Sequence, residues 1–89
     1  MKVYDVRTEV LSETGEVVES GHLVGLSFSS SSAGATVEIT VGGAPVLSLK
    51  VPANETRLWS LPSGHYLYLP AGSVVDITGN NAMVMLYFR

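Results

Sequence analysis

The stretch that decides the fold is Thr36-Val37-Glu38-Ile39-Thr40-Val41-Gly42-Gly43-Ala44-Pro45-Val46-Leu47-Ser48-Leu49-Lys50-Val51. Apolar and polar residues alternate on both sides of its centre, and a period of two is the period of a β-strand. The two central glycines can take the positive φ angles that a tight hairpin requires. The stretch therefore predicts two antiparallel strands, residues 36–41 and 46–51, joined by a short turn.

The same period continues outward in both directions. Further strands are expected at residues 2–11, 16–19, 22–29, 56–61, 65–69, 73–78 and 83–88. Within these segments, Val24, Leu26 and Phe28 are expected on one face of their strand. The last segment is apolar on both faces, which is typical of a strand that is central in its sheet or covered by a partner.

Glycine and proline interrupt the chain often enough to exclude a long helix. From residue 15 onward, one or the other breaks every stretch of a dozen residues, and the helix period fits nowhere in the chain. Short strands separated by turns every 8–12 residues are typical of all-β sandwiches. The sequence therefore predicts a small antiparallel β-sandwich, jelly-roll-like, with about eight short strands.

The composition favours a domain that is covered by other subunits. The chain has 89 residues and no Cys, and only 15% of its residues are charged, against roughly 25% in an average domain. A fold of this size buries only about 60–65% of its unfolded surface, and without Cys it has no disulfide or thiolate-ligated zinc to support it. Burial in an assembly is therefore favoured over a monomer with a Ser/Thr/Gly surface.

The most charged part of the chain is its beginning. Residues 1–20 are expected to form an N-terminal hairpin or an arm that reaches a neighbouring subunit. Residues 21–89 are expected to form the β-sandwich body, with one domain overall.

The charge and hydropathy patterns argue against two classes of partner. The net charge is −3 and the five basic residues are scattered, which disfavours binding to nucleic-acid phosphates. No run approaches the roughly 20 apolar residues of a membrane helix. The charged N-terminus does not fit a signal peptide, so we expect synthesis in a cytoplasm and no membrane partner.

The side chains capable of chemistry do not form a recognised catalytic pattern. His22, His65, Asp5 and Asp76 accompany many serines, but no Gly-x-Ser-x-Gly elbow is present. The two histidines are not at metal-site spacing. The serine-rich segment 29–35 lacks the Gly-Lys-Ser/Thr ending of a phosphate-binding loop. We therefore expect no enzyme activity, no metal and no cofactor.

Three aromatic residues allow two interpretations. Trp59, Tyr66 and Tyr68 could form a platform on which a sugar ring stacks. Alternatively, Trp59 fills the sandwich core and the tyrosines lie at an edge, which the burial preference of aromatic residues favours.

A longer pattern extends from Gly21 to the end of the chain. It begins with a strand, Gly25-Leu26-Ser27-Phe28, which a serine-rich loop connects to the strand Thr36-Val37-Glu38-Ile39-Thr40-Val41. A glycine turn then leads to Val46-Leu47-Ser48-Leu49-Lys50-Val51. Further along, Tyr68-Leu69-Pro70-Ala71-Gly72 precedes a terminal hairpin that ends in Tyr87-Phe88-Arg89. This succession of strands and turns resembles small β-sandwich proteins of tailed bacteriophage virions, of the capsid cement or decoration type. Other such proteins belong to the neck or tail.

The resemblance implies a structural role. It implies a cement protein of the virion that bridges capsomers, as a homotrimer, with the major capsid protein and copies of itself as partners. A carbohydrate- or receptor-binding module of a tail fibre, or a neck or tail structural protein, stays an alternative. Tyr, His and Arg are enriched at interfaces. On that basis the residues expected to contact partners are Tyr4, Arg7, His65, Tyr66, Tyr68, Tyr87 and Arg89.

Overall fold

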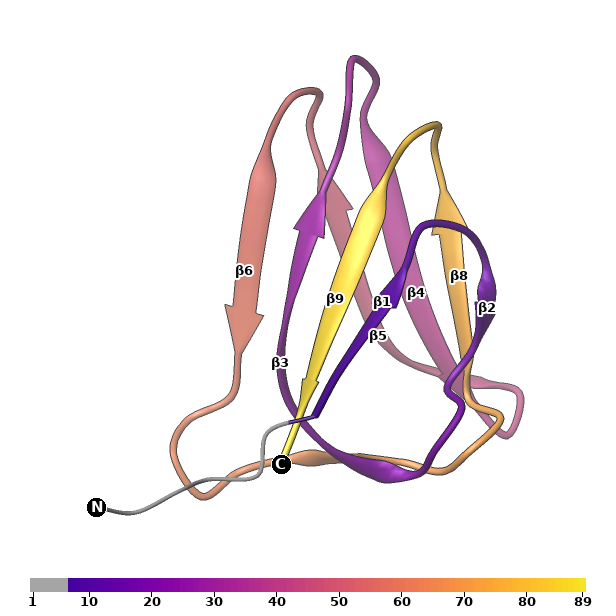
Figure 1. Cartoon of the computed structure of the whole chain (residues 1–89), viewed down its shortest axis with the longest axis vertical. Coiled ribbons are helices and arrows are strands. Elements are labelled where there is room, and N and C mark those ends of the chain that lie inside the picture. The colour runs from indigo at the N-terminus through magenta and orange to yellow at the C-terminus, as the bar shows by residue number, and fades with distance from the viewer. Residues whose placement is uncertain (1–6) are drawn as a thin grey trace.

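The chain folds into a β-sandwich of two antiparallel sheets (Figure 1). The computed structural model describes residues 7–89, so Tyr4 and the start of the first expected strand lie outside the described residues. Within the described residues the strands are β1 Arg7–Leu11, β2 Gly15–Glu16, β3 Gly21–Ser29, β4 Ala35–Val41, β5 Ala44–Val51, β6 Thr56–Ser60, β7 Leu67–Leu69, β8 Val74–Thr78 and β9 Met83–Phe88. The predicted antiparallel β-sandwich is confirmed, and the finer expectation of jelly-roll connectivity stays a prediction.

The two sheets draw on both halves of the chain. Sheet A has the order β1-β9-β3-β6, with β7 paired to the first residues of β3. Sheet B has the order β2-β8-β4-β5. Most neighbours within a sheet are therefore distant in sequence. Pairing between distant strands slows folding compared with local contacts, because long loops must close before the strands meet.

The expected hairpin forms at β4 and β5. The two strands pair from Ala35 opposite Val51 to Val41 opposite Ala44. Gly42 and Gly43 turn the chain with φ angles of 58° and 84°. Positive φ at both positions is the geometry of a two-residue turn that matches the twist of the flanking strands. The prediction made from the alternation of residues 36–51 is confirmed.

The core lies between the two sheets. Sheet B contributes Val37, Ile39, Val51 and Val75, which are fully buried. Sheet A contributes the fully buried side chains of Leu23, Leu26, Phe28, Val84, Leu86 and Phe88. In both sheets the buried residues recur at the strand period, which accounts for the apolar alternation of the sequence.

β9 is central in sheet A, between β1 and β3. Val84, Leu86 and Phe88 point into the core, and its other three side chains point outward. The prediction that this doubly apolar strand is central in its sheet, one of the two alternatives, is confirmed.

One expected face is corrected by a β-bulge in β3. Leu23 pairs with Phe88 and Gly25 pairs with Tyr87, so Val24 is an extra residue between consecutive partners. The extra residue reverses the alternation, and Leu23 enters the core while Val24 is only half-buried. The expectation that Val24 shares a face with Leu26 and Phe28 in a regular strand was wrong for this reason.

Residues 7–20 contribute a strand to each sheet. β1 is an edge strand of sheet A and β2 is an edge strand of sheet B, so the two strands do not pair with each other. The chain then returns towards β3 past Val17, whose backbone N–H donates to the Ser73 carbonyl at 2.8 Å and whose carbonyl accepts from Gly72 at 2.8 Å. Val17 is also buried in the core. This part of the chain is thus integrated into the sandwich.

Candidate interaction surface

The outer face of sheet A can be read from the strand register. In an antiparallel pair, residues opposite each other point to the same side of the sheet. Because Val84, Leu86 and Phe88 are buried, Met83, Met85 and Tyr87 point outward. Their partners share that side, which gives the outer face as Thr8, Val10, Gly25, Ser27, Ser29, Thr56, Leu58, Ser60, Met83, Met85 and Tyr87.

This face is uncharged over strands β1, β9, β3 and β6, and it mixes apolar side chains with Ser and Thr. Val10 is 55% exposed, Leu58 79% and Met83 40%. Among residues 7–89, no Asp or Glu of sheet A projects from this side. Two cations lie near it: Arg89 follows β9, and Arg57 alternates with Thr56 and Leu58 along β6. Large exposed apolar side chains without charge are typical of a surface that another protein covers.

The outer face of sheet B is different. There Glu16, Glu38 and Asp76 alternate with the buried residues of their strands, and Glu38 lies directly opposite Asp76. Lys50 projects from β5 on the same side. A face with several hydrated carboxylates is costly to bury, so the two faces of the sandwich differ in their capacity to form an interface.

Tyr87 covers small residues in the middle of the outer face of sheet A. Its hydroxyl oxygen is 3.2 Å from the Ser27 hydroxyl oxygen and 4.0 Å from the Met85 sulfur. The ring thus reaches across the small residues of β3, and Ser27 is left only 8% exposed. Gly25 at the same level has no room for a side chain, since a Cβ there would lie 2.9 Å from the Trp59 carbonyl oxygen. Ser27 and Gly25 are therefore covered at the middle of β3.

One end of this surface carries an aromatic cluster. The His22 and Tyr66 rings stack with centroids 4.1 Å apart and planes at 22°, and Tyr68 meets His22 edge-on at 5.8 Å. A recess of about 390 Å³ beside the stack is lined by His22, Val24, Gly64, His65, Tyr66 and Arg89. The Arg89 backbone N–H donates to the His22 carbonyl at 2.8 Å, which holds the end of β9 against the start of β3.

The structure brings most of the expected contact residues together. His65, Tyr66 and Arg89 line the recess, and Tyr68 pairs with His22 in the adjoining strand. Tyr87 lies on the same side of sheet A, along β9 from Arg89. That these residues contact a partner stays a prediction.

Sequence reasoning missed the most exposed members of the surface. Val10 and Leu58 were not expected as contact residues, although each is more than half exposed. The sequence shows which residues share a face of each strand. Which of the two faces points outward depends on the pairing with β9 and β3.

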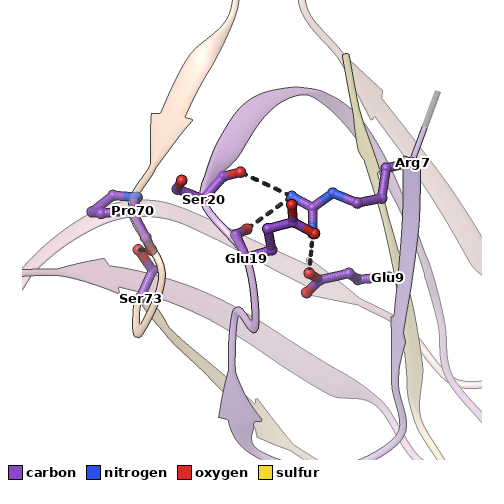
Figure 2. Close-up of polar contacts among 6 residues, drawn as sticks. All are labelled: Arg7, Glu9, Glu19, Ser20, Pro70 and Ser73. Atoms are coloured by element: carbon purple, nitrogen blue, oxygen red, sulfur yellow. Dashed lines mark hydrogen bonds and ion pairs between the residues drawn. The ribbon is translucent and has the colours of Figure 1, made fainter. Parts of the chain in front are cut away.

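Arg7 lies on the opposite side of β1 and makes contacts within the chain (Figure 2). Its guanidinium forms an ion pair with Glu9, and its Nη2 donates to the Glu19 carbonyl at 2.8 Å. The same guanidinium lies 4.2 Å from the centroid of the Phe88 ring. Arg7 thus fastens β1 to the segment that precedes β3, and its side chain is 30% exposed.

Trp59 points away from the aromatic cluster. It pairs with Leu26, which is buried, and packs against the core from the edge strand β6. Tyr66 and Tyr68 are 56% and 53% exposed. Trp59 is thus partly buried against the core and does not fill it, and its side of the sheet is opposite to that of Tyr68, so the three residues do not form a common platform.

The groups that could act in acid–base chemistry are dispersed. His22 and His65 lie at the end of sheet A, whereas Asp76 lies on the outer face of sheet B and accepts from the Thr14 hydroxyl at 2.9 Å. Within residues 7–89, no group of three or more His, Asp or Glu side chains could hold a metal ion. The same residues include no helix long and apolar enough to cross a membrane. No family model, curated protein or solved structure matches this chain.

Proposed function

We propose that this chain is a structural protein of a bacteriophage virion, a capsid cement or decoration protein that bridges capsomers as an assembly of copies. The observation that carries the proposal is the difference between the two faces of the sandwich. The outer face of sheet A presents Val10, Leu58 and Met83 to solvent, and none of its described strand residues is charged.

Such a surface suits a protein that binds to other subunits of an assembled shell. Burial of apolar surface contributes about 25 cal/mol per Å², and it stabilises an assembled shell because the protein binds the assembled state only. The low charge content of the chain supports the same role, since interface cores are depleted in charge. The homotrimer that the resemblance implies is part of this proposal.

The test is the protein content of purified particles. Virions from the source of this chain should contain it in many copies, and electron microscopy should place it on the outside of the head. Particles that lack it should lose their genome at lower temperature than complete ones. Its absence from purified virions, or its location at a single position on the tail, would overturn the proposal of a cement protein.

A second candidate function rests on the aromatic cluster. Tyr66 and Tyr68 are half-exposed beside the recess of about 390 Å³, and aromatic rings of this kind can stack on the apolar face of a sugar. A carbohydrate-binding module of a tail fibre would show saturable glycan binding that Tyr66→Ala abolishes. Because Trp59 lies on the other side of the sheet, Trp59→Phe is the matched control and should leave that binding unchanged.

A further inference from the structure

We infer that the outer face of sheet A is the surface through which copies of this chain bind one another. The inference rests on the proposed function for its setting. It pairs two copies face to face about a two-fold axis, so a homotrimer would need a further contact elsewhere on the chain. Three arguments support a second copy over a protein of different chemistry.

The first argument is electrostatic. Two copies carry the same charges, so an interface between them must not place charged side chains of the same sign opposite each other. The chain carries a net charge of −3, and on sheet B its carboxylates Glu16, Glu38 and Asp76 point to the opposite side of the sandwich. Two outer faces of sheet A can meet while these groups stay in water, about the 10 Å sheet-to-sheet spacing away from the contact. At that distance salt screens most of their repulsion.

The second argument concerns the alternative partner. A different protein that binds an acidic chain ordinarily presents a basic patch, which steers the encounter and pairs with carboxylates. The described residues of the outer face of sheet A present no carboxylate to such a patch. Recognition there rests on apolar side chains together with Ser and Thr hydroxyls, and the same face of a second copy offers both.

The third argument is size. The body measures 40 × 33 × 19 Å, and its shortest axis is the viewing direction of Figure 1. A broad face of such a body presents on the order of 1,000 Å², compared with the roughly 800 Å² per partner that a standard interface buries. Strands β1, β9, β3 and β6, which lie about 4.8 Å apart, form only part of that broad side, so the loops around them would have to join the contact for it to reach this area.

The absence of Cys from the sequence provides a direct test of coverage. Single-cysteine variants Leu58→Cys and Val10→Cys place a thiol on the face, and Val18→Cys places one on the β2–β3 connection. Val18 is 85% exposed and Leu58 79%, so the thiols of these two variants are matched in accessibility on an isolated copy. The rate of maleimide labelling is measured from about 1 µM to about 100 µM protein, the range in which a micromolar interface assembles.

The expected result is protection confined to the face. As native mass spectrometry shows the monomer giving way to an oligomer, labelling of the Leu58→Cys and Val10→Cys variants should slow at least tenfold. The Val18→Cys variant should keep its monomer labelling rate over the same range. A Leu58→Lys variant should need at least tenfold more protein to assemble, whereas Val18→Lys should assemble as the wild type does. Both positions are exposed, so neither change is expected to unfold the chain.

Two results would overturn the inference. The wild type could stay monomeric over the whole range, or the Leu58→Cys and Val10→Cys variants could assemble while their thiols keep full reactivity. The proposed function is tested separately by the purified particles. A monomeric chain that is still found on the capsid ends this inference and the homotrimer, but it leaves the role of a cement protein standing. An assembled chain that is absent from virions ends that role and leaves this inference standing.

Discussion

Replacement of Arg7 by alanine should destabilise the sandwich well beyond the effect of an ordinary surface substitution. The change removes the contact with the Phe88 ring at 4.2 Å and the hydrogen bond to the Glu19 carbonyl at 2.8 Å. It also leaves the Glu9 side chain, which is only 14% exposed, without its cation. A cation–π contact contributes about 0.5–1 kcal/mol and a charge-assisted hydrogen bond about 1.5 kcal/mol.

The expected loss in the free energy of unfolding is about 2 kcal/mol, because partial exposure of Arg7 weakens each of these contributions. For a domain of this size that corresponds to a fall in the melting temperature of roughly 8–16 °C. Urea unfolding followed by circular dichroism measures the loss, with an unchanged m-value as the sign that only stability has changed. Arg7→Lys should recover about half, since an ammonium keeps the charge but loses the planar fork.

The matched control is Arg57→Ala in the edge strand β6. Arg57 and Glu55 form an ion pair at 3.9 Å with both side chains 52% exposed, so its removal should cost less than about 0.5 kcal/mol. If Arg7→Ala and Arg57→Ala lower the stability equally, Arg7 does not fasten β1 to the rest of the sandwich and the reasoning fails.

Three further predictions concern the body of the fold. Leu86→Ala should cost about 3 kcal/mol in urea unfolding of the monomer and Leu58→Ala less than about 0.5, because the first side chain is fully buried and the second is 79% exposed; equal costs would mean that the two faces of sheet A are misassigned. Gly25→Ala should cost about 1–3 kcal/mol in the same assay, since its Cβ would lie 2.9 Å from the Trp59 carbonyl, and the fluorescence of that tryptophan should shift as β6 moves; an unperturbed spectrum with native stability would contradict the close approach. Gly42→Ala should cost about 1 kcal/mol through its φ of 58° alone, and Gly42→Asn should recover most of the loss, whereas equal stability of all three chains would exclude a strained turn.

The local part of this fold could be predicted from the sequence, and the pairing of distant strands could not. Alternation at residues 36–51 and the adjacent glycines specify a hairpin. Its two strands are neighbours in the chain, and its two-residue turn needs residues that adopt positive φ, which glycine does. The crossing of the chain from β1 in sheet A to β2 in sheet B leaves no comparable signal. The turn residues after Leu11 would equally fit a hairpin in which the strands on either side of the turn pair with each other. Instead, β1 pairs with β9 in sheet A and β2 pairs with β8 in sheet B.

The bulge in β3 shows the same limit at one residue. A strict period of two places Val24 with Leu26 and Phe28, and nothing in the composition of the segment marks Val24 as the extra residue. The bulge becomes necessary only when Leu23 must meet Phe88 and Gly25 must pass close to the Trp59 backbone. Those are demands of strands β9 and β6, which are distant from β3 in sequence.

The surface that the proposals depend on follows from the same pairing. Aromatic, His and Arg residues near strand ends could be selected by residue type, and several of them do lie together beside the recess. Val10 and Leu58 could not, because an apolar residue in an alternating strand belongs to the core or to the outside according to its partner. Their exposure is a property of the sheet, and it appears only after β1 and β6 are placed at its two edges.

The last strand, β9, is apolar on both of its faces. The two explanations for a strand that is apolar on both faces, a central position and coverage by a partner, apply here to different sides of β9. The central position accounts for Val84, Leu86 and Phe88, which the second sheet covers. It does not account for Met83, Met85 and Tyr87, because a strand can be central while its outer side chains are polar, as Glu38 shows on β4 of sheet B. The outer side of β9 therefore keeps apolar side chains that the sandwich covers only in part, and this is the side on which we propose that a second copy binds.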